Sequence, residues 1–167
     1  MSNVRDGTIH PIFLARGEGR SIRNPLGGAL EFKARAEQTA GMLTAFESAP
    51  GPGEGPPLHV HEDDNEVLYF LDGLFRMKIE DVVRNAPSGS FAFIPKGVPH
   101  TWQNISNEHG RLLVMFLPGA AGMEQFFEQF AADVAGEAAV AERFATLGKA
   151  AGMKVVGPPL VQSDPLD

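Results

Sequence analysis

Cysteine is absent from this chain of 167 residues. Its absence excludes disulfide bonds, thiolate nucleophiles and cysteine-based zinc sites, and it is compatible with any redox compartment. Positive charge is also scarce, because 14 Lys and Arg side chains stand against 21 Asp and Glu, giving a formal net charge of −7. A nucleic-acid-binding surface needs clustered Lys and Arg, so we expect no nucleic-acid partner. The basic cluster of Arg16, Arg20 and Arg23 indicates a solvated edge or loop rather than an anion site.

Long apolar runs are missing as well. No stretch approaches the ~18 apolar residues of a membrane span, and no basic N-terminal segment leads into an apolar run. We therefore expect no membrane partner and a cytoplasmic protein. The length suffices for one buried core and leaves little room for a second, which predicts a single domain over residues 1–167.

Four potential metal ligands lie close together in the sequence: His59, His61, Glu66 and His100. Three imidazoles and one carboxylate suit a first-row transition metal better than calcium or magnesium, which prefer all-oxygen shells. Residues two apart on a strand share a face, so His59 and His61 can reach one point. Glu66 opens a further predicted strand, and a turn rich in proline and glycine delivers His100 to the start of another.

Both ligand segments are bracketed by glycines at fixed spacing. The first reads Gly53, five residues, His59-Val60-His61, four residues, Glu66, six residues, Gly73. The second reads Gly89, five residues, Pro95-Lys96-Gly97, two residues, His100, three residues, Asn104. These segments match both sequence motifs of the cupin family, with the fifteen-residue stretch 74–88 between them. The chain therefore resembles a cupin over residues of about 40 to 118.

The resemblance implies an all-β fold, the cupin double-stranded β-helix or jelly-roll barrel, with a metal near its centre. Its ligands would be His59, His61, Glu66 and His100. The cofactor would be one divalent transition-metal ion, and Fe, Ni, Mn, Co, Cu and Zn all remain open because each accepts imidazole and carboxylate. The family also leads us to expect a homodimer. The motif glycines and Pro95 should shape turns, and Asn104 should hydrogen bond at a turn or strand end.

Hydrophobic patterning predicts a barrel core over residues of about 29 to 118. Residues 29–36 and 41–48 should form strands, and residues 8–14 are a candidate edge strand. Residues 112–117 are apolar throughout, which predicts a strand covered on both faces, by the C-terminal helices or by a second subunit. Alternation predicts that Phe75, Met77 and Ile79 face inward, and that Met42, Thr44 and Phe46 line a largely apolar cavity.

Beyond the barrel the apolar period changes to that of a helix. Two stripes predict two amphipathic C-terminal α-helices over residues of about 120 to 152; they consist of Met123, Phe126, Phe127 and Phe130, and of Val140, Phe144, Leu147 and Ala151. These side chains should pack on the outer sheet of the barrel, with a pocket lid as the alternative. The segments 118–119, 124–128 and 156–160 resemble the tails of single-domain quercetin-dioxygenase-like cupins.

That narrower resemblance implies a non-haem metal dioxygenase that acts on an enolisable aromatic small molecule such as a flavonol. Glu66 would be the proton acceptor or a plain ligand, since carboxylates on metals serve both purposes. A metal-assisted polyketide cyclase or isomerase, and a non-enzymatic metal-dependent small-ligand binding protein, remain as alternatives. Trp102 should either line the pocket or pack in the core. His10 and His109 are expected at the surface.

Overall fold

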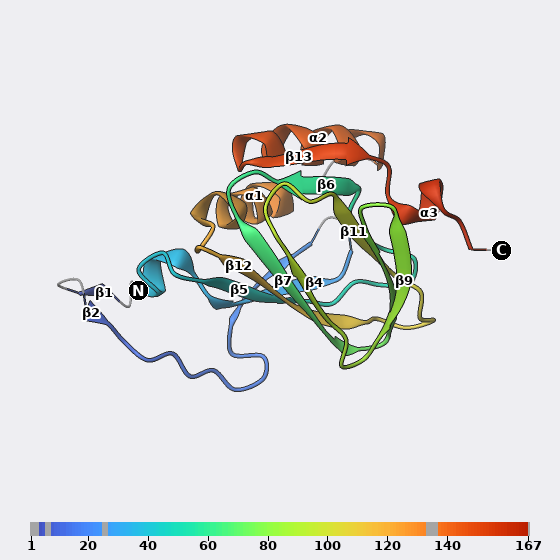
Figure 1. Ribbon diagram of the computed structural model, residues 1–167. Coiled ribbons are helices and arrows are strands. Elements are labelled where there is room, and N and C mark those ends of the chain that lie inside the picture. The colour runs from blue at the N-terminus through green and yellow to red at the C-terminus, as the bar shows by residue number, and fades with distance from the viewer. Residues whose placement is uncertain (1–3, 6–7, 25–26, 133–136, 167) are drawn as a thin grey trace.

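Two antiparallel β-sheets face each other in the computed structural model, which describes residues 4–5, 8–24, 27–132 and 137–166 (Figure 1). The six-stranded sheet has the order β10 (Phe91–Ile94), β7 (Asn65–Asp72), β12 (Arg111–Leu117), β5 (Thr44–Ser48), β4 (Ala29–Ala34) and β3 (Arg20–Arg23). The five-stranded sheet has the order β13 (Met153–Gly157), β6 (Leu58–His61), β11 (His100–Asn104), β8 (Leu74–Ile79) and β9 (Val82–Pro87). The predicted all-β jelly-roll fold is confirmed.

The inner faces of the two sheets share one hydrophobic core. Its barrel members are Leu30, Phe32, Phe46, Leu68, Phe70, Phe75, Met77, Ile94, Leu112, Val114 and Phe116. The predicted inward direction of Phe75 and Met77 is confirmed, and Ile79 packs against the same cluster. Burying one such side chain contributes roughly 1.5–3 kcal/mol. A core of this size leads us to expect a barrel that folds without a metal.

The two predicted helices are present as α1 (Ala121–Ala132) and α2 (Glu137–Ala150). Their position differs from the expected packing on the outer sheet, because Phe126, Phe130 and Phe144 join the barrel core. The ring of Phe127 lies 4.9 Å from that of Phe46, which is buried on the inner face of β5. The helices therefore close one lateral edge of the barrel. Among the helices that the structure describes, none is long and apolar enough to cross a membrane.

Two elements after the helices were not predicted from the sequence. Strand β13 pairs antiparallel with β6, with Met153 opposite His61 and Val155 opposite His59, so the strand that carries two candidate ligands is flanked on both sides. The short helix α3 (Leu160–Ser163) follows. Arg76 of β8 donates hydrogen bonds to the carboxylate and backbone carbonyl of Asp164, which fixes this tail against the five-stranded sheet.

Three expectations about the strands are wrong in detail. Residues 8–14 yield only the two-residue β2 (Thr8–Ile9), which pairs with β1 (Val4–Arg5). Strand β4 ends at Ala34, a 3-10 helix (Ala36–Gln38) follows, and β5 begins at Thr44, so Met42 lies outside the strand and is 59% exposed.

Within this chain, strand β12 is covered on one face. Leu112, Val114 and Phe116 are buried on the inner face, whereas Leu113, Met115 and Leu117 on the outer face remain partly exposed. The expected cover by the helices is wrong, because they pack against the interior. Cover by a second subunit stays a prediction.

Candidate metal centre

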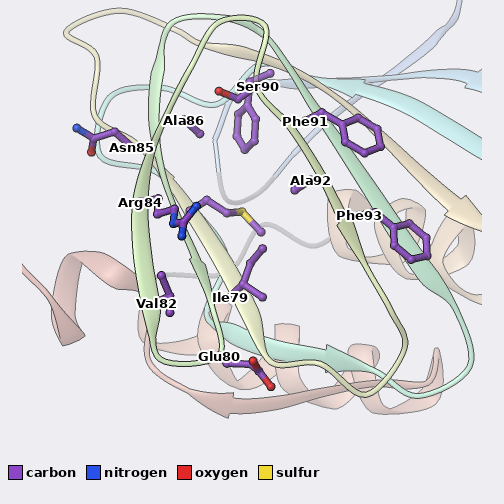
Figure 2. Close-up of a pocket in the computed structure, with 12 residues that line it drawn as sticks. Ile79, Glu80, Val82, Arg84, Asn85, Ala86, Ser90, Phe91, Ala92 and Phe93 are labelled. Carbon is purple, nitrogen blue, oxygen red and sulfur yellow. The ribbon is translucent and has the colours of Figure 1, made fainter.

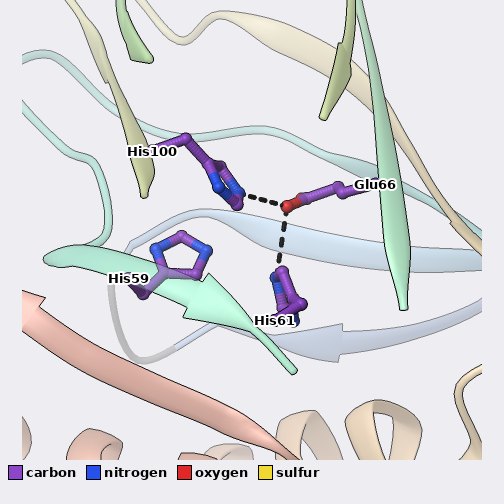
Figure 3. A group of neighbouring side chains, drawn as sticks. All are labelled: His59, His61, Glu66 and His100. Atoms are coloured by element: carbon purple, nitrogen blue, oxygen red, sulfur yellow. Dashed lines mark hydrogen bonds and ion pairs between the residues drawn. The ribbon is translucent and has the colours of Figure 1, made fainter. Parts of the chain in front are cut away.

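The four candidate ligands come from three strands and meet between the sheets. His59 and His61 lie two apart on β6, and His59 pairs directly with His100 of β11 in the neighbouring strand. Glu66 lies near the start of β7 in the opposite sheet and reaches across to the imidazoles (Figure 3). The sequence expectation that these four residues converge is confirmed, because one ligand atom from each lies within 4.8 Å of all the others. All four side chains are buried.

The Glu66 carboxylate contacts two of the three imidazoles. Oε2 of Glu66 lies 2.6 Å from Nε2 of His100 and 3.2 Å from Nε2 of His61. The second contact has the length of an ion pair but not the direction of a hydrogen bond, so both ring nitrogens of His61 are buried without a hydrogen-bond partner among the described residues. A buried polar atom without a partner is costly. A cation at the centre of the group would give Nε2 of His61 a role.

Backbone carbonyls orient two of the imidazoles. Nδ1 of His59 lies 2.8 Å from the carbonyl oxygen of Pro57, and Nδ1 of His100 lies 2.9 Å from that of Val98. A carbonyl only accepts, so Nδ1 carries a proton in both rings, and Nε2 is the nitrogen that faces the group. Metal-binding histidines commonly have such a partner on the second nitrogen.

The electrostatics of the group suit a cation. Burial lowers the pKa of His59 to about 3, and the neighbouring His100 and His61 add to this shift. Burial alone would raise the pKa of Glu66, but His100 and His61 outweigh it and hold that pKa below its usual range. Burial opposes charge on His100 too, yet Glu66 raises its pKa overall. An ionised carboxylate among imidazoles fits a divalent first-row transition metal.

Aromatic side chains surround the ligands on the side of the helices. A space of about 50 Å³ beside His59, His61 and Glu66 is lined by side chains that include Phe46, Trp102, Phe116, Phe126, Phe127, Phe144 and Met153. Trp102 thus borders the site and also contacts the ring of Phe75 at 5.9 Å, so both expected roles apply. Thr44 and Phe46 point inward as expected, whereas the exposed Met42 does not contribute.

The remaining sequence expectations concern residues outside the ligand group. His10 and His109 are exposed, as expected. The motif glycines 53, 73, 89 and 97 all have positive φ. The Asn104 side chain donates to the carbonyl oxygens of Pro50, Gly51 and Glu108. Of the basic cluster, Arg20 pairs with Glu128 at 2.9 Å. The sequence reading missed Glu124, a buried carboxylate whose apolar helical neighbours concealed it.

Comparisons with known proteins agree with this geometry. A family model described as Cupin domain matches residues 47–116. Quercetin 2,3-dioxygenase of Bacillus subtilis is 31% identical over 98 residues, which make up 58% of this chain and 28% of that protein. Protein SchB of Streptomyces halstedii is 31% identical over 77 residues, 45% of this chain and 56% of that protein. The chain thus matches between 28% and 56% of the length of these curated relatives.

Solved structures with low sequence identity share the fold. KdgF from Halomonas sp. has a TM-score of 0.62 at 18% identity, covering 68% of this chain and 99% of that one. The polyketide cyclase RemF from Streptomyces resistomycificus has a TM-score of 0.55 at 21% identity, covering 65% and 80%. Both ligand-bearing motifs lie within the matched residues 47–116, on a jelly-roll barrel of two facing sheets. The barrel region of the chain, residues 47–116, thus matches the cupin domain in sequence and has a jelly-roll fold.

Proposed function

We propose that this chain is a metal-dependent cupin enzyme, a quercetinase-like dioxygenase that acts on an enolisable aromatic small molecule and dioxygen. The observation that carries the proposal is the buried group of three imidazoles and one ionised carboxylate, with one ligand atom of each within 4.8 Å of the others. The 31% identity to the quercetin 2,3-dioxygenase of Bacillus subtilis supports the reaction class. The proposal includes one metal ion per chain and a cytoplasmic location.

Each residue of the site has its own proposed role. His59, His61 and His100 would hold the metal through Nε2, with two of the rings fixed by backbone carbonyls. A bound divalent metal supplies Lewis acidity, which lowers the pKa of a coordinated hydroxyl and stabilises the oxyanion. Glu66, ionised and 2.6 Å from His100, accepts the hydroxyl proton of the substrate. The aromatic wall around Phe116 and Phe127 excludes water from the reacting centre.

A metal-assisted polyketide cyclase or isomerase is the second candidate. The structural likeness to the polyketide cyclase RemF favours it, although at 21% identity this likeness concerns the fold. Such an enzyme would use the same Lewis acid and the same base without consuming dioxygen. A protein that only binds a small ligand through its metal is the third.

Metal analysis followed by an oxygen-electrode screen separates these candidates. Freshly purified protein is assayed for transition metals by elemental analysis, reloaded with each metal in turn, and offered flavonols, catechols and diketones. Oxygen uptake with substrate loss supports the dioxygenase. Substrate loss without oxygen uptake favours the cyclase or isomerase, and binding without any turnover favours the ligand-binding protein. The matched control is the double variant His59→Ala, His61→Ala, which should be inactive.

The role of Glu66 is tested by Glu66→Gln. The amide keeps the size and one ligating oxygen but loses the negative charge and most of the basicity. General-base assistance typically contributes ~10² to 10⁴ in rate, so turnover should fall by that factor in variant protein whose metal content equals that of the wild type. Activity within about threefold of wild type, far short of that range, would leave Glu66 as a ligand only.

A further inference from the structure

The two lateral edges of the barrel differ in how they are closed. At one edge α1 and α2 place their phenylalanines between the sheets. At the other edge, β9 and β10 are the terminal strands of their sheets and are not hydrogen bonded to each other. A cavity of about 530 Å³ lies along this seam (Figure 2). We call it the seam cavity; its walls include Phe70, Met77, Ile79, Ala86 and Ala92 from both sheets.

The seam cavity approaches the candidate metal ligands. Ile79, in its wall, is the register partner of His100, and Ile94 is the register partner of Glu66. Directly opposed residues of an antiparallel pair project to the same face with Cβ atoms about 4.5–5.5 Å apart. The side chains of Ile79 and Ile94 therefore lie next to the candidate ligands, and Ile79 both neighbours His100 and lines the cavity. On the helix side, the space beside the ligands is only about 50 Å³.

One cation, Arg84, lies among the mainly apolar side chains that line this cavity. Arg84 pairs with Met77 in the β8–β9 register, so its side chain belongs to the inner face of the sheet. Figure 2 shows it extending from β9 into the opening, opposite Ala92 of β10. Within the described ranges no carboxylate pairs with Arg84, although Glu80 also lines the cavity. An inward charge on an edge strand can simply discourage edge-to-edge aggregation, which is the alternative to a binding role.

We propose that the seam cavity binds a flat aromatic anion, a carboxylate or phenolate, whose charged group pairs with Arg84. Its volume lies in the range of small-molecule sites, about 300–1,000 Å³, and such sites combine apolar walls with few polar groups. A guanidinium matches a planar carboxylate through two parallel hydrogen bonds. The apolar body of the ligand lies against Phe70 and Met77, with its far end toward Ile79 and the metal ligands. This assignment rests on the proposed function and names the substrate class.

The test uses two probes of equal shape, 2-naphthoate and the neutral 2-naphthamide, titrated calorimetrically into the full-length chain. The variants are Arg84→Gln, Arg84→Lys and Ala92→Phe. The matched control is Lys154→Gln, which removes an exposed cation from β13, the opposite edge strand of the same sheet.

Wild-type protein should bind 2-naphthoate more tightly than 2-naphthamide. Arg84→Gln should weaken 2-naphthoate roughly tenfold or more while leaving 2-naphthamide within about threefold, since hydrogen bonds between charged groups are the stronger ones. Arg84→Lys should keep part of the preference for the anion, Ala92→Phe should weaken both probes by filling the cavity, and Lys154→Gln should change neither.

Two results would overturn the proposal. The first is equal affinity of wild-type protein for both probes, including failure to bind either at millimolar concentration. The second is a loss in Arg84→Gln no larger than in Lys154→Gln, which would leave Arg84 as edge protection. Titration of the metal-free variant His59→Ala, His61→Ala separates the two hypotheses. Binding of 2-naphthoate there, with no turnover by metal-loaded wild type, would refute the enzyme and keep the anion site. Turnover by metal-loaded wild type without binding of the probe would refute the anion site and keep the enzyme.

Discussion

Helix α1 should depend for its docking on one buried carboxylate. Glu124 lies in the first turn of α1 and is 4% exposed. Its oxygens accept hydrogen bonds from Nε of Arg35 at 2.9 Å, from the backbone N–H of Ala36 at 2.6 Å and from the hydroxyl of Thr44 at 2.6 Å. The Thr44 hydroxyl in turn accepts from the N–H of Ala120 at 3.1 Å. This network binds the start of the helix to β5 and to the 3-10 helix.

Glu124→Gln should therefore lower the free energy of unfolding, although glutamine has nearly the same shape as glutamate. The new NH₂ group can only donate, so it opposes at least one of three donors that keep their positions in the interior. Removing one partner of a buried charge pair typically costs about 3–5 kcal/mol, and we expect a loss of unfolding free energy in that range. Glu128, one turn later, gives a matched control, because it contacts Arg35 at 3.2 Å but its side chain is 27% exposed. Its replacement by Gln should cost only ~0–1 kcal/mol.

The measurement is urea unfolding of both variants, followed by far-UV circular dichroism and by the fluorescence of Trp102, the sole tryptophan. The two probes should give coincident transitions if the barrel and its helices unfold together. A difference between Glu124→Gln and Glu128→Gln below about 1 kcal/mol would refute the reasoning, since it would place the buried carboxylate in the class of surface ion pairs.

Further predictions concern the metal and the assembly. The double variant His59→Ala, His61→Ala should bind no metal yet keep the wild-type circular dichroism; full metal content by elemental analysis would contradict the assignment. Because Glu66 raises the pKa of His100 against the effect of burial, protons should compete for this ligand already above its ordinary pKa of about 6.5. Metal affinity in chelator competition should thus fall as the pH drops, and a constant affinity from about pH 8 to pH 5 would argue against His100 as a ligand. The expected homodimer should use the partly apolar outer face of the six-stranded sheet, so Tyr69→Glu should give a monomer by light scattering. The control Val156→Glu on β13 should not, and a monomeric wild type would refute the dimer.

The members of the candidate ligand group were predictable because the spacing that marks them is local. His59 and His61 share a strand face by the two-residue period. A polar turn precedes Glu66 and a turn rich in glycine and proline precedes His100, which places both near strand starts. That these strands meet in space came from the family resemblance and not from periodicity. The antiparallel register of β6 with β11, which sets His59 opposite His100, depends on pairing between segments about forty residues apart, and no local pattern encodes it.

The errors arose where tertiary context decides burial. The apolar run 112–117 predicted a strand covered on both faces, by the helices or by a second subunit. The helices leave its outer face partly exposed, and composition alone could not tell these two covers apart. Met42 lies in phase with Thr44 and Phe46, yet the strand begins only at Thr44, so the alternation does not extend to it. The phenylalanine stripe of α1 was correctly predicted as helical. The surface on which this stripe packs was not predicted correctly, because an apolar stripe specifies that a face is buried and not which surface covers it.

The direction of the Arg84 side chain follows from the register of its hairpin. The segment 82–86 suggests a surface strand by itself, but the two-residue connection Glu80-Asp81, with φ of 53° at Glu80, joins it to β8. Short hairpins of this kind fix the register of their strands, and here Ile79 lies opposite Val82 and Met77 opposite Arg84. Since alternation already predicts Met77 to face inward, the register sends Arg84 inward too. A slip by one residue would place the guanidinium on the solvent face, so the anion site depends on this turn as much as on the charge itself.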